Sequence, residues 1–214
     1  MLTSGQWVIK EVLGFNVKDK SILICSNELH PLQSNIFKVR VKDGKRTLLD
    51  NGEGVHFGKL SPSGSLLVDS YSSPTVTRNI NLTNTVSGKS VEIFTAENPW
   101  KDYNVPEITS GSIKAADGVT DLYYRMVKPV DFDPTKKYPT VIYVYGGPHA
   151  HNVEASRNYY ARGWEIYMAQ KGYLLFILDN RGSQHRGIEF ENVTHRQLGV
   201  EEMKDQMEGV KFLK

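Results

Sequence analysis

The sequence has one cysteine, no long hydrophobic run and almost no net charge, and each shortage excludes a class of protein. Cys25 alone can form neither an intrachain disulfide nor a cysteine-built zinc site, and its setting in "SILICSN" is typical of a small buried apolar residue. No run approaches the roughly 20 apolar residues of a membrane span, so no transmembrane segment is predicted. The 26 basic and 24 acidic residues leave a net charge of +2, which gives no argument for a nucleic acid or an anionic membrane as partner.

Sequence motifs that would identify a catalytic nucleophile, a phosphate-binding loop or a metal site are also missing. The sequence has no Gly-x-Ser-x-Gly elbow for a serine nucleophile, and no Gly-rich phosphate loop that ends in Lys-Ser or Lys-Thr. His149 and His151 lie two residues apart beside "YGGP", but no further ligands follow at the spacing of a zinc site. We therefore expect no metal and no cofactor.

Residues 1–96 read as β structure throughout. Short runs rich in β-branched and aromatic residues, such as "SILICSN" and "NIFKVRV", alternate with turn sequences such as "KDGK" and "SPSG". The stretch from "KDKSILICSN" resembles the stretch from "SPSGSLLVDSYSS" at an offset of roughly 45 residues, which is typical of four-stranded propeller blades. Two copies cannot close a propeller, so either the repeat is a coincidence or the chain is a piece of a longer protein.

Residues 97–112 form a linker by composition, and residues 113–214 follow a different pattern. A hairpin is predicted around "ADGVTD", and "TVIYVYGG" reads as a strand buried on both faces. A helix packed through Trp164, Tyr167 and Met168 follows and stops at Gly172, and "YLLFILDNRGS" is a second buried strand. This order implies a parallel α/β sheet with crossover helices.

The last predicted helix covers "GVEEMKDQMEGVKFLK". Its apolar residues follow a three-to-four spacing, which predicts that they face the core: Val200, Met203, Met207 and Val210. A partial propeller and a parallel sheet of only two strands both leave strand edges unpaired. We therefore expect the chain to be part of a longer protein.

Three stretches of the second half resemble a known family: "KKYPTVIYVYGGPHA", "GWEIYMAQKGYLLFILDNRGSQHRG" and "HRQLGVEEMKDQMEGVKFL". They are similar to the opening of the peptidase domain in the dipeptidyl peptidase IV branch of the prolyl oligopeptidase family. In the first half, "LTSGQWVI" resembles the segment that opens one of the last propeller blades in that branch. Within the branch, "VYGGPHA" and "MAQKGY" look most similar to bacterial prolyl tripeptidyl aminopeptidases, with dipeptidyl peptidase IV second.

The resemblance implies a fold class, namely about two blades of a β-propeller followed by the N-terminal part of an α/β-hydrolase domain. It implies residues 1–96 as the C-terminal blades and residues 113–214 as the start of a peptidase domain. In the family, a Ser-Asp-His triad cleaves peptides after proline or alanine and needs no cofactor. The triad positions would lie beyond Lys214, so the isolated chain is predicted to be inactive. The resemblance also suggests a homodimer and a periplasmic or cell-surface location in a bacterium.

One catalytic position of the family falls inside the chain. The tyrosine of the "VYGGP"-type motif, here Tyr145, donates its hydroxyl to the oxyanion hole in the family. A preorganised donor at that place stabilises the negative charge that develops on the carbonyl oxygen, and two glycines let the backbone approach a substrate closely. On the residues alone, Tyr143 and Tyr145 could both be core tyrosines. We assign no catalytic role to Tyr143. Arg181, in the turn after the second buried strand, could shape the pocket, but we favour its interpretation as a charge that holds the turn together.

Two other functions stay open at this stage. One is a non-catalytic binding module derived from a propeller, with the α/β half as a scaffold. The other is a relative of the acylaminoacyl peptidases or oligopeptidases. A Gly-x-Ser-x-Gly sequence within about 30 residues after Lys214 favours an enzyme, and a stop codon there favours the module.

Overall fold

The computed structural model describes residues 2–214, which form two compact units. The β unit comprises residues 2–98 together with residues 154–157, and the α/β unit comprises residues 99–153 and 158–214. Within residues 2–214, no helix is both long enough and apolar enough to cross a membrane.

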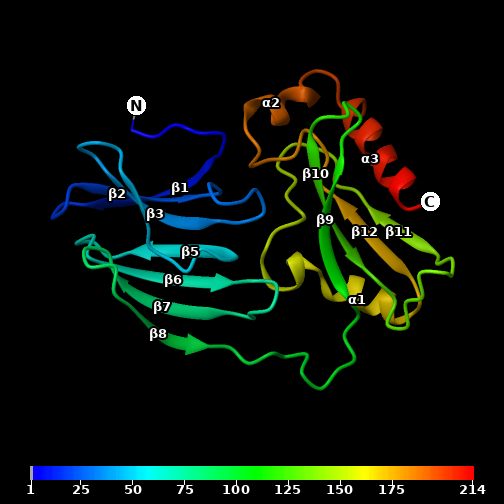
Figure 1. Cartoon of the computed structure of the whole chain (residues 1–214), viewed down its shortest axis with the longest axis horizontal. Coiled ribbons are helices and arrows are strands. Elements are labelled where there is room, and N and C mark those ends of the chain that lie inside the picture. The colour runs from blue at the N-terminus through cyan, green and yellow to red at the C-terminus, as the bar shows by residue number, and fades with distance from the viewer. Residues whose placement is uncertain (1) are drawn as a thin grey trace. The chain divides into compact units, whose positions relative to one another are not determined.

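Two four-stranded antiparallel sheets make up the β unit (Figure 1). The first contains β1 (Ile9–Asn16), β2 (Ser21–Ser26), β3 (Asn35–Arg40) and β4 (Arg46–Leu48), and the second contains β5 (Val55–Leu60), β6 (Leu66–Ser72), β7 (Asn79–Asn84) and β8 (Ser90–Thr95). In each sheet every strand pairs with the next one along the chain. Both runs named in the sequence analysis, "SILICSN" and "NIFKVRV", contain one of these strands, and the predicted β character of this half is confirmed.

An apolar core lies between the two sheets. The first sheet contributes Leu23, Cys25 and Ile36, and the second contributes Leu67. The sheets approach closely at Gly58, where an added Cβ would lie 2.6 Å from Cδ1 of Leu13. Burial raises the pKa of the Cys25 thiol to about 12, so this side chain stays a neutral part of the core, as its sequence setting predicts.

His56 forms a buried charged cluster in the second sheet and is only 1 % exposed. Its Nδ1 lies 2.9 Å from Oδ2 of Asp69 and 3.8 Å from Oδ2 of Asp50, and its Nε2 donates to the Glu53 carbonyl at 2.8 Å. Both ring nitrogens face acceptors, so the geometry suits the imidazolium. The ring also stacks on Tyr71 with centroids 4.7 Å apart. Burial alone would lower the pKa of His56, but the bonds and charges of the two aspartates outweigh it, and the pKa is raised.

The raised pKa of His56 predicts that the cluster stabilises the protein less as the pH rises. Protonated His56 favours the folded state, so its contribution is complete below the usual histidine value and is lost as the pH passes through the raised value. Thermal unfolding of wild type and His56→Gln should differ by about 3 kcal/mol near pH 6 and by clearly less near pH 9. The exposed His195 supplies the control variant His195→Gln, which removes no buried ion pair and should cost less than about 1 kcal/mol near pH 6. A difference that grows with pH would contradict the prediction.

The α/β unit is built on one four-stranded sheet in the order β11-β12-β10-β9. Its strands are β9 (Ile108–Lys114), β10 (Asp121–Val127), β11 (Thr140–Tyr143) and β12 (Leu174–Leu178). Its helices are α1 (Gly163–Gln170), α2 (Ile188–Glu191), η2 (Asn192–Thr194) and α3 (Glu201–Phe212), and the short η1 (Arg157–Tyr160) begins in the β unit and continues into this one. β11 and β12 run parallel with α1 between them, as predicted. The sheet as a whole is mixed, however, because the predicted hairpin, β9 and β10, adds to it antiparallel to β12.

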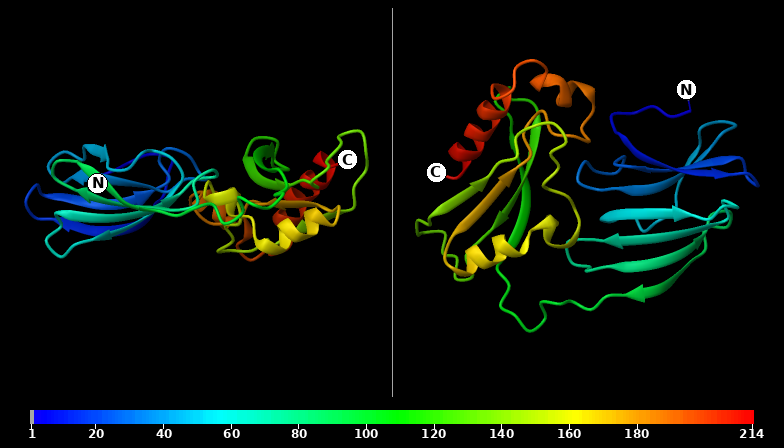
Figure 2. Two further views of the ribbon diagram at one scale, coloured as in Figure 1. Left: turned by 90° about the horizontal axis from the view of Figure 1, so that it is seen from below. Right: turned by 180° about the vertical axis from the view of Figure 1, so that it is seen from behind.

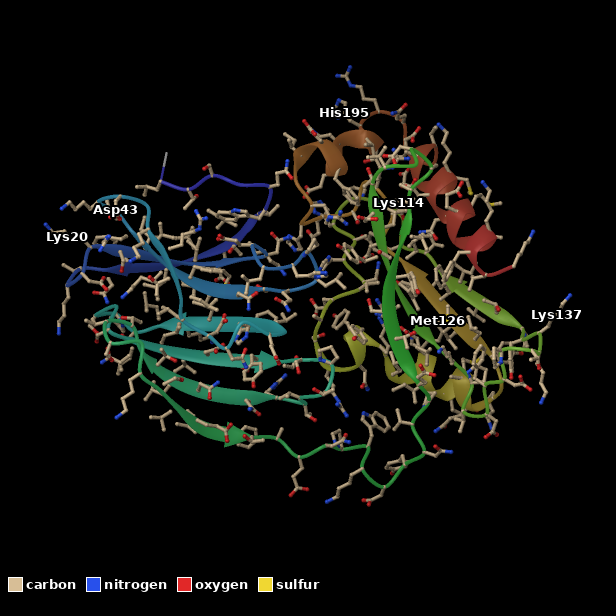
Figure 3. All side chains as sticks on the ribbon, in the orientation of Figure 1. Lys20, Asp43, Lys114, Met126, Lys137 and His195 are labelled. Carbon is tan, nitrogen blue, oxygen red and sulfur yellow. The ribbon has the colours of Figure 1, made fainter. Side chains whose placement is uncertain are left out.

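The hairpin is closed by the residues that flank its turn. Lys114 and Asp121 are opposite each other in the register, and Nζ of Lys114 lies 2.8 Å from Oδ1 of Asp121 (Lys114 is labelled in Figure 3). The first strand begins at Ile108, within the predicted linker.

The helices α1 and α3 cover opposite faces of this sheet (Figure 2). Arg125 of β10 is opposite Ile177 of β12 and points to the face where it meets Glu165 of α1. Phe176 of β12 points the other way, and its ring centroid lies 6.0 Å from that of Phe212 in α3. The buried strand β12 therefore has a helix on each side, and the prediction of a fully buried second strand is confirmed.

β11 is less buried than the sequence predicts. The expected strand over 140–147 ends at Tyr143, and its residues are exposed or half-buried. Within the described residues, β11 is the edge of its sheet and pairs only with β12. The continuous apolar run therefore predicted the strand correctly, but the prediction that both its faces are buried is wrong.

The buried face of α1 also differs from the prediction. Glu165, Ile166 and Ala169 are buried, whereas Trp164 and Tyr167 are exposed. Glu165 is buried because it pairs with Arg125, and this turns the helix away from its aromatic side. The helix ends as predicted, with Gly172 at φ 89° just after the cap.

α3 shows the largest difference of this kind. Its buried residues are Glu202, Asp205, Gln206 and Gly209. Of the four residues predicted to face the core, Val200, Met203 and Met207 are exposed and Val210 is half-buried. A Cβ on Gly209 would lie 3.0 Å from Cε1 of Phe176, so glycine lets this face approach the sheet. The polar face packs inward because its side chains have partners there, and the prediction from apolar spacing is wrong.

Candidate active site

The loop after β11 carries Tyr145, the residue singled out by the sequence. The Tyr145 side chain is 59 % exposed, and it lies two residues beyond the end of the strand. Gly146 follows with φ 77°, a conformation that favours glycine. The next turn is closed by a hydrogen bond from the Ala150 amide to the Gly147 carbonyl at 3.3 Å. The ring therefore projects outward from a backbone that bends sharply beneath it.

Asp179, the first residue after β12, holds the far end of this loop. Its carboxylate accepts hydrogen bonds from the backbone amides of Asn152 and Val153, each at 2.9 Å, and from Nδ2 of Asn152 at 3.0 Å. Burial raises the pKa of Asp179, although these donors pull it in the opposite direction. Three donors on one buried carboxylate fix the path of residues 152–153.

Asn180 holds the near end. Its Nδ2 donates to the Gly146 carbonyl at 3.1 Å and to the Arg181 carbonyl at 2.7 Å. Its Oδ1 accepts from Nε2 of Gln206 in α3 at 2.9 Å, and the same Nε2 donates to the Leu178 carbonyl at 3.0 Å. Hydrogen bonds between side-chain amides thus connect Gln206 of α3, through Asn180, to the carbonyl of Gly146, the residue after Tyr145.

Arg181 completes this row of three anchors. Its guanidinium binds Asp205 of α3 through Nε at 2.9 Å and Nη2 at 2.8 Å, and it also pairs with Glu201 at 2.9 Å and Asp117 at 3.2 Å. Hydrogen bonding to Asp205 raises the pKa of Arg181. This set of partners agrees with the interpretation of Arg181 as a charge that holds its turn together.

Arg125 is a supporting residue that the sequence analysis missed. It is only 1 % exposed and forms a forked ion pair with Glu165, with Nε at 3.0 Å and Nη2 at 2.9 Å. Its Nη1 donates to the carbonyls of Asn152 and Tyr159, the latter at 2.8 Å. The sequence signal that could have identified Arg125 is an arginine in the middle of the largely apolar strand "DLYYRMV".

Tyr143 lies in a different environment from Tyr145. The guanidinium carbon of Arg162 lies 4.7 Å from the centroid of the Tyr143 ring, and Trp164 packs at a centroid distance of 6.2 Å. The two tyrosines therefore lie in different environments, and only Tyr143 is part of β11. Tyr143 is half-buried among α1 side chains, and Tyr145 is open to a ligand.

A cavity of about 320 Å³ lies beside the same loop. Its lining consists of Pro148, His149, Gly182, Glu191, Asn192, Thr194, His195, Arg196 and Leu198. His149 and Arg196 both have positive φ, at 67° and 59°, which is uncommon for residues other than glycine. Of the histidines beside the motif, His149 faces this cavity, whereas the His151 ring packs edge-on against His185 with centroids 5.0 Å apart.

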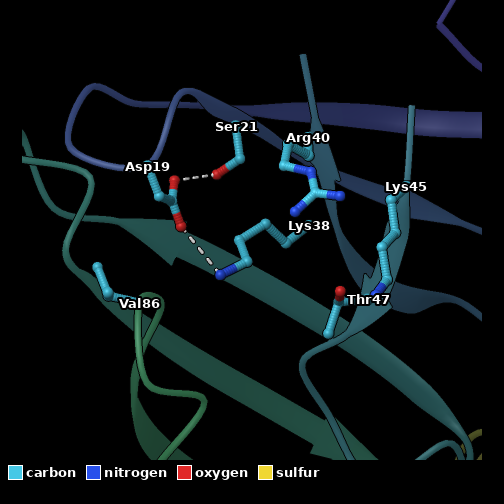
Figure 4. A pocket seen from close by; sticks show the side chains of 7 residues that line it. All are labelled: Asp19, Ser21, Lys38, Arg40, Lys45, Thr47 and Val86. Carbon is cyan, nitrogen blue, oxygen red and sulfur yellow. Dashed lines mark hydrogen bonds and ion pairs between the residues drawn. The ribbon is translucent and has the colours of Figure 1, made fainter. Parts of the chain in front are cut away.

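The β unit has a hollow of its own, shown in Figure 4. Seven residues line it: Asp19, Ser21, Lys38, Arg40, Lys45, Thr47 and Val86. Most of its charges are neutralised within the unit, because Lys38 pairs with Asp19 at 2.9 Å and Arg40 pairs with Asp43. The hollow therefore offers little net charge with which to hold a ligand.

Comparison with known proteins gives matches to both halves of the chain. Residues 1–78 match the model of the dipeptidyl peptidase IV N-terminal region, and residues 159–214 match that of the prolyl oligopeptidase family. Dipeptidyl peptidase 8 of Homo sapiens is 29 % identical over 231 residues, which cover 99 % of this chain and 25 % of that protein. Dipeptidyl peptidase 4 of Trichophyton equinum is 27 % identical over 221 residues, which cover 99 % of this chain and 28 % of that protein.

Solved structures agree with these matches. The crystal structure of a putative dipeptidyl aminopeptidase IV from Bacteroides ovatus superposes with a TM-score of 0.91 at 49 % identity, over 99 % of this chain and 30 % of that one. Porphyromonas gingivalis dipeptidyl peptidase 4 superposes with a TM-score of 0.85 at 28 % identity, over 96 % of this chain and 29 % of that one. The chain thus spans between a quarter and a third of the length of these relatives.

Proposed function

We propose, from the membership of this chain in the dipeptidyl peptidase IV branch of the prolyl oligopeptidase family, that the full-length protein is a serine exopeptidase. In this proposal it releases N-terminal di- or tripeptides whose last residue is proline or alanine. The observation that supports it most is the exposed Tyr145 on a loop anchored by buried residues. That is the arrangement needed for a hydrogen-bond donor that must meet a reacting carbonyl at a fixed place.

Tyr145 acts in this proposal as one donor of the oxyanion hole. When the serine attacks the scissile carbonyl, negative charge collects on the carbonyl oxygen. A phenol hydroxyl held about 2.7–3.1 Å from that oxygen stabilises the charge by roughly 3–4 kcal/mol. The second donor would be the backbone N–H after the nucleophile, as is usual for this class of hydrolase.

The proposed layout assigns a part of the whole protein to each segment. Residues 1–96 are the last blades of a β-propeller, which corresponds to the two four-stranded sheets. Residues 97–112 lead from the blades into β9, the first strand of the α/β unit, and residues 113–214 open the peptidase domain. The serine, aspartate and histidine of the triad belong to the remaining part of the protein. The full-length protein is proposed to be a homodimer, which sedimentation velocity tests directly.

Peptidase assays of the full-length protein and of the 214-residue chain test this proposal. The full-length protein should release the chromophore from Gly-Pro or tripeptidyl-Pro p-nitroanilides, and a serine-directed phosphonate should abolish the release. The chain alone should give no release above a matched blank, because it has no nucleophile elbow. Absence of turnover by a folded full-length protein on both substrate types, or turnover by the chain alone, would contradict the proposal.

A further inference from the structure

We infer that Asn180 is a positioning residue for catalysis, which sets the place of the Tyr145 hydroxyl through the Gly146 carbonyl. The inference rests on the proposed function of Tyr145. Its basis is the contact between Nδ2 of Asn180 and the Gly146 carbonyl at 3.1 Å, made by a side chain that is only 1 % exposed.

The backbone on both sides of Gly146 explains why this contact matters. Val144 and Tyr145 lie beyond the end of β11, so no ladder hydrogen bonds hold them. Gly146 and Gly147 have the widest choice of backbone angles of any residues. The bond to the Gly146 carbonyl restrains the peptide between these two glycines, one residue away from Tyr145. Since a misplacement of about 1 Å can cost roughly 100-fold in rate, this restraint acts on catalysis rather than only on stability.

The orientation of the Asn180 amide is itself fixed. Its nitrogen faces two carbonyl oxygens, those of Gly146 and Arg181, and its oxygen faces Nε2 of Gln206. Nε2 of Gln206 in turn faces two oxygens, from Asn180 and Leu178. Turning either amide over would set oxygen against oxygen, so each partner allows one orientation. The position of the Gly146 carbonyl is thereby tied to helix α3.

The neighbouring anchors do not duplicate this role. Asp179 binds the backbone at residues 152–153, which lie seven and eight residues after Tyr145 along the chain, and Arg181 binds Asp205, Glu201 and Asp117. Of the three consecutive side chains, only Asn180 bonds to the glycine next to the tyrosine. Removal of the Asn180 side chain should therefore leave the loop folded but make the backbone at Tyr145 and Gly146 more mobile.

A double-mutant cycle in the full-length protein tests the inference. We expect Asn180→Ala to lower kcat about 10- to 100-fold while KM stays within about twofold, because the substrate still binds but its oxyanion meets a mobile donor. In the Tyr145→Phe background the same Asn180→Ala change should lower kcat by less than about twofold, because the hydroxyl that it positions is already gone.

Asn16 supplies the matched control. It is an equally buried amide in the β unit, where its Nδ2 donates to Oγ1 of Thr85 at 2.8 Å. Asn16→Ala should lower the thermal midpoint by an amount similar to Asn180→Ala and leave kcat unchanged. If Asn180→Ala does not fold, Gln206→Met replaces it, because this change keeps the volume and removes the donor that holds Oδ1 of Asn180 to α3, and kcat should fall about threefold or more.

The possible outcomes distinguish a failure of the proposed role of Tyr145 from a failure of the positioning role of Asn180. If Tyr145→Phe leaves kcat unchanged, the proposed role of Tyr145 fails and the role of Asn180 fails with it. If Tyr145→Phe is slow but Asn180→Ala is as fast as wild type, only the positioning role is overturned. It is also overturned if Asn180→Ala lowers kcat by the same factor in both backgrounds, since the residue would then act independently of the hydroxyl.

Discussion

Tyr145→Phe in the full-length protein is expected to lower kcat about 100- to 1,000-fold, the range measured when one donor of an oxyanion hole is removed. The change deletes a single hydroxyl group from a side chain that is 59 % exposed. Its ring keeps its place, and no buried polar group loses a partner, so the thermal midpoint should move by less than about 1 °C. KM should change little, because the hydroxyl acts most strongly on the charge of the transition state.

Tyr167 is the natural control for this variant. It is a tyrosine of the same unit with nearly the same exposure, 57 %, and its ring lies against the Lys171 ammonium on α1. Tyr167→Phe should leave kcat unchanged. A Tyr145→Phe protein with wild-type kcat would remove Tyr145 from the oxyanion hole, whereas an equal loss in both variants would point to a general effect of removing surface hydroxyls.

The second large effect is expected at Arg125. Arg125→Met should destabilise the α/β unit by about 3–5 kcal/mol, because it leaves the buried Glu165 without its forked ion-pair partner. Two backbone carbonyls, of Asn152 and Tyr159, lose their donor as well. Denaturant unfolding followed by circular dichroism measures the change as a lower midpoint.

A double variant distinguishes the effect of losing Arg125 from the effect of leaving Glu165 buried without an ion-pair partner. Arg125→Met combined with Glu165→Gln removes both charges, so it should be more stable than Arg125→Met alone. The exposed pair of Lys128 and Glu107, at 2.9 Å, provides the comparison, and Lys128→Met should cost less than about 1 kcal/mol. If Arg125→Met costs no more than Lys128→Met, the buried pair is not the support described here.

Local signals in the sequence predicted most of the elements. The alternation of β-rich runs and turn residues located all eight strands of the β unit, and the apolar run "LLFIL" located the buried β12. Gly172 was correctly predicted to end α1. These features depend on residues close together in the chain, so a reading of short windows is sufficient to find them.

The orientation of the helices could not be predicted from the same signals. Glu165 is turned inward by Arg125, 40 residues earlier, and Asp205 is turned inward by Arg181 and by the Ala116 amide. Such pairs are long-range contacts between polar groups, and apolar spacing carries no trace of them. For the same reason, the family resemblance pointed to Tyr145, but no local signal pointed to Asn180, whose bond to the Gly146 carbonyl joins segments 34 residues apart.

The row of Asp179, Asn180 and Arg181 has a consequence for how this chain can vary. The three side chains have different sets of partners: Asp179 binds the backbone at 152–153, Asn180 binds the Gly146 carbonyl and Gln206 of α3, and Arg181 binds Asp205 of α3. Loops usually accept insertions and deletions more readily than the elements they connect. Here the deletion of a single residue would move these side chains out of register with their partners. We therefore expect this turn to tolerate single substitutions but not a change in length.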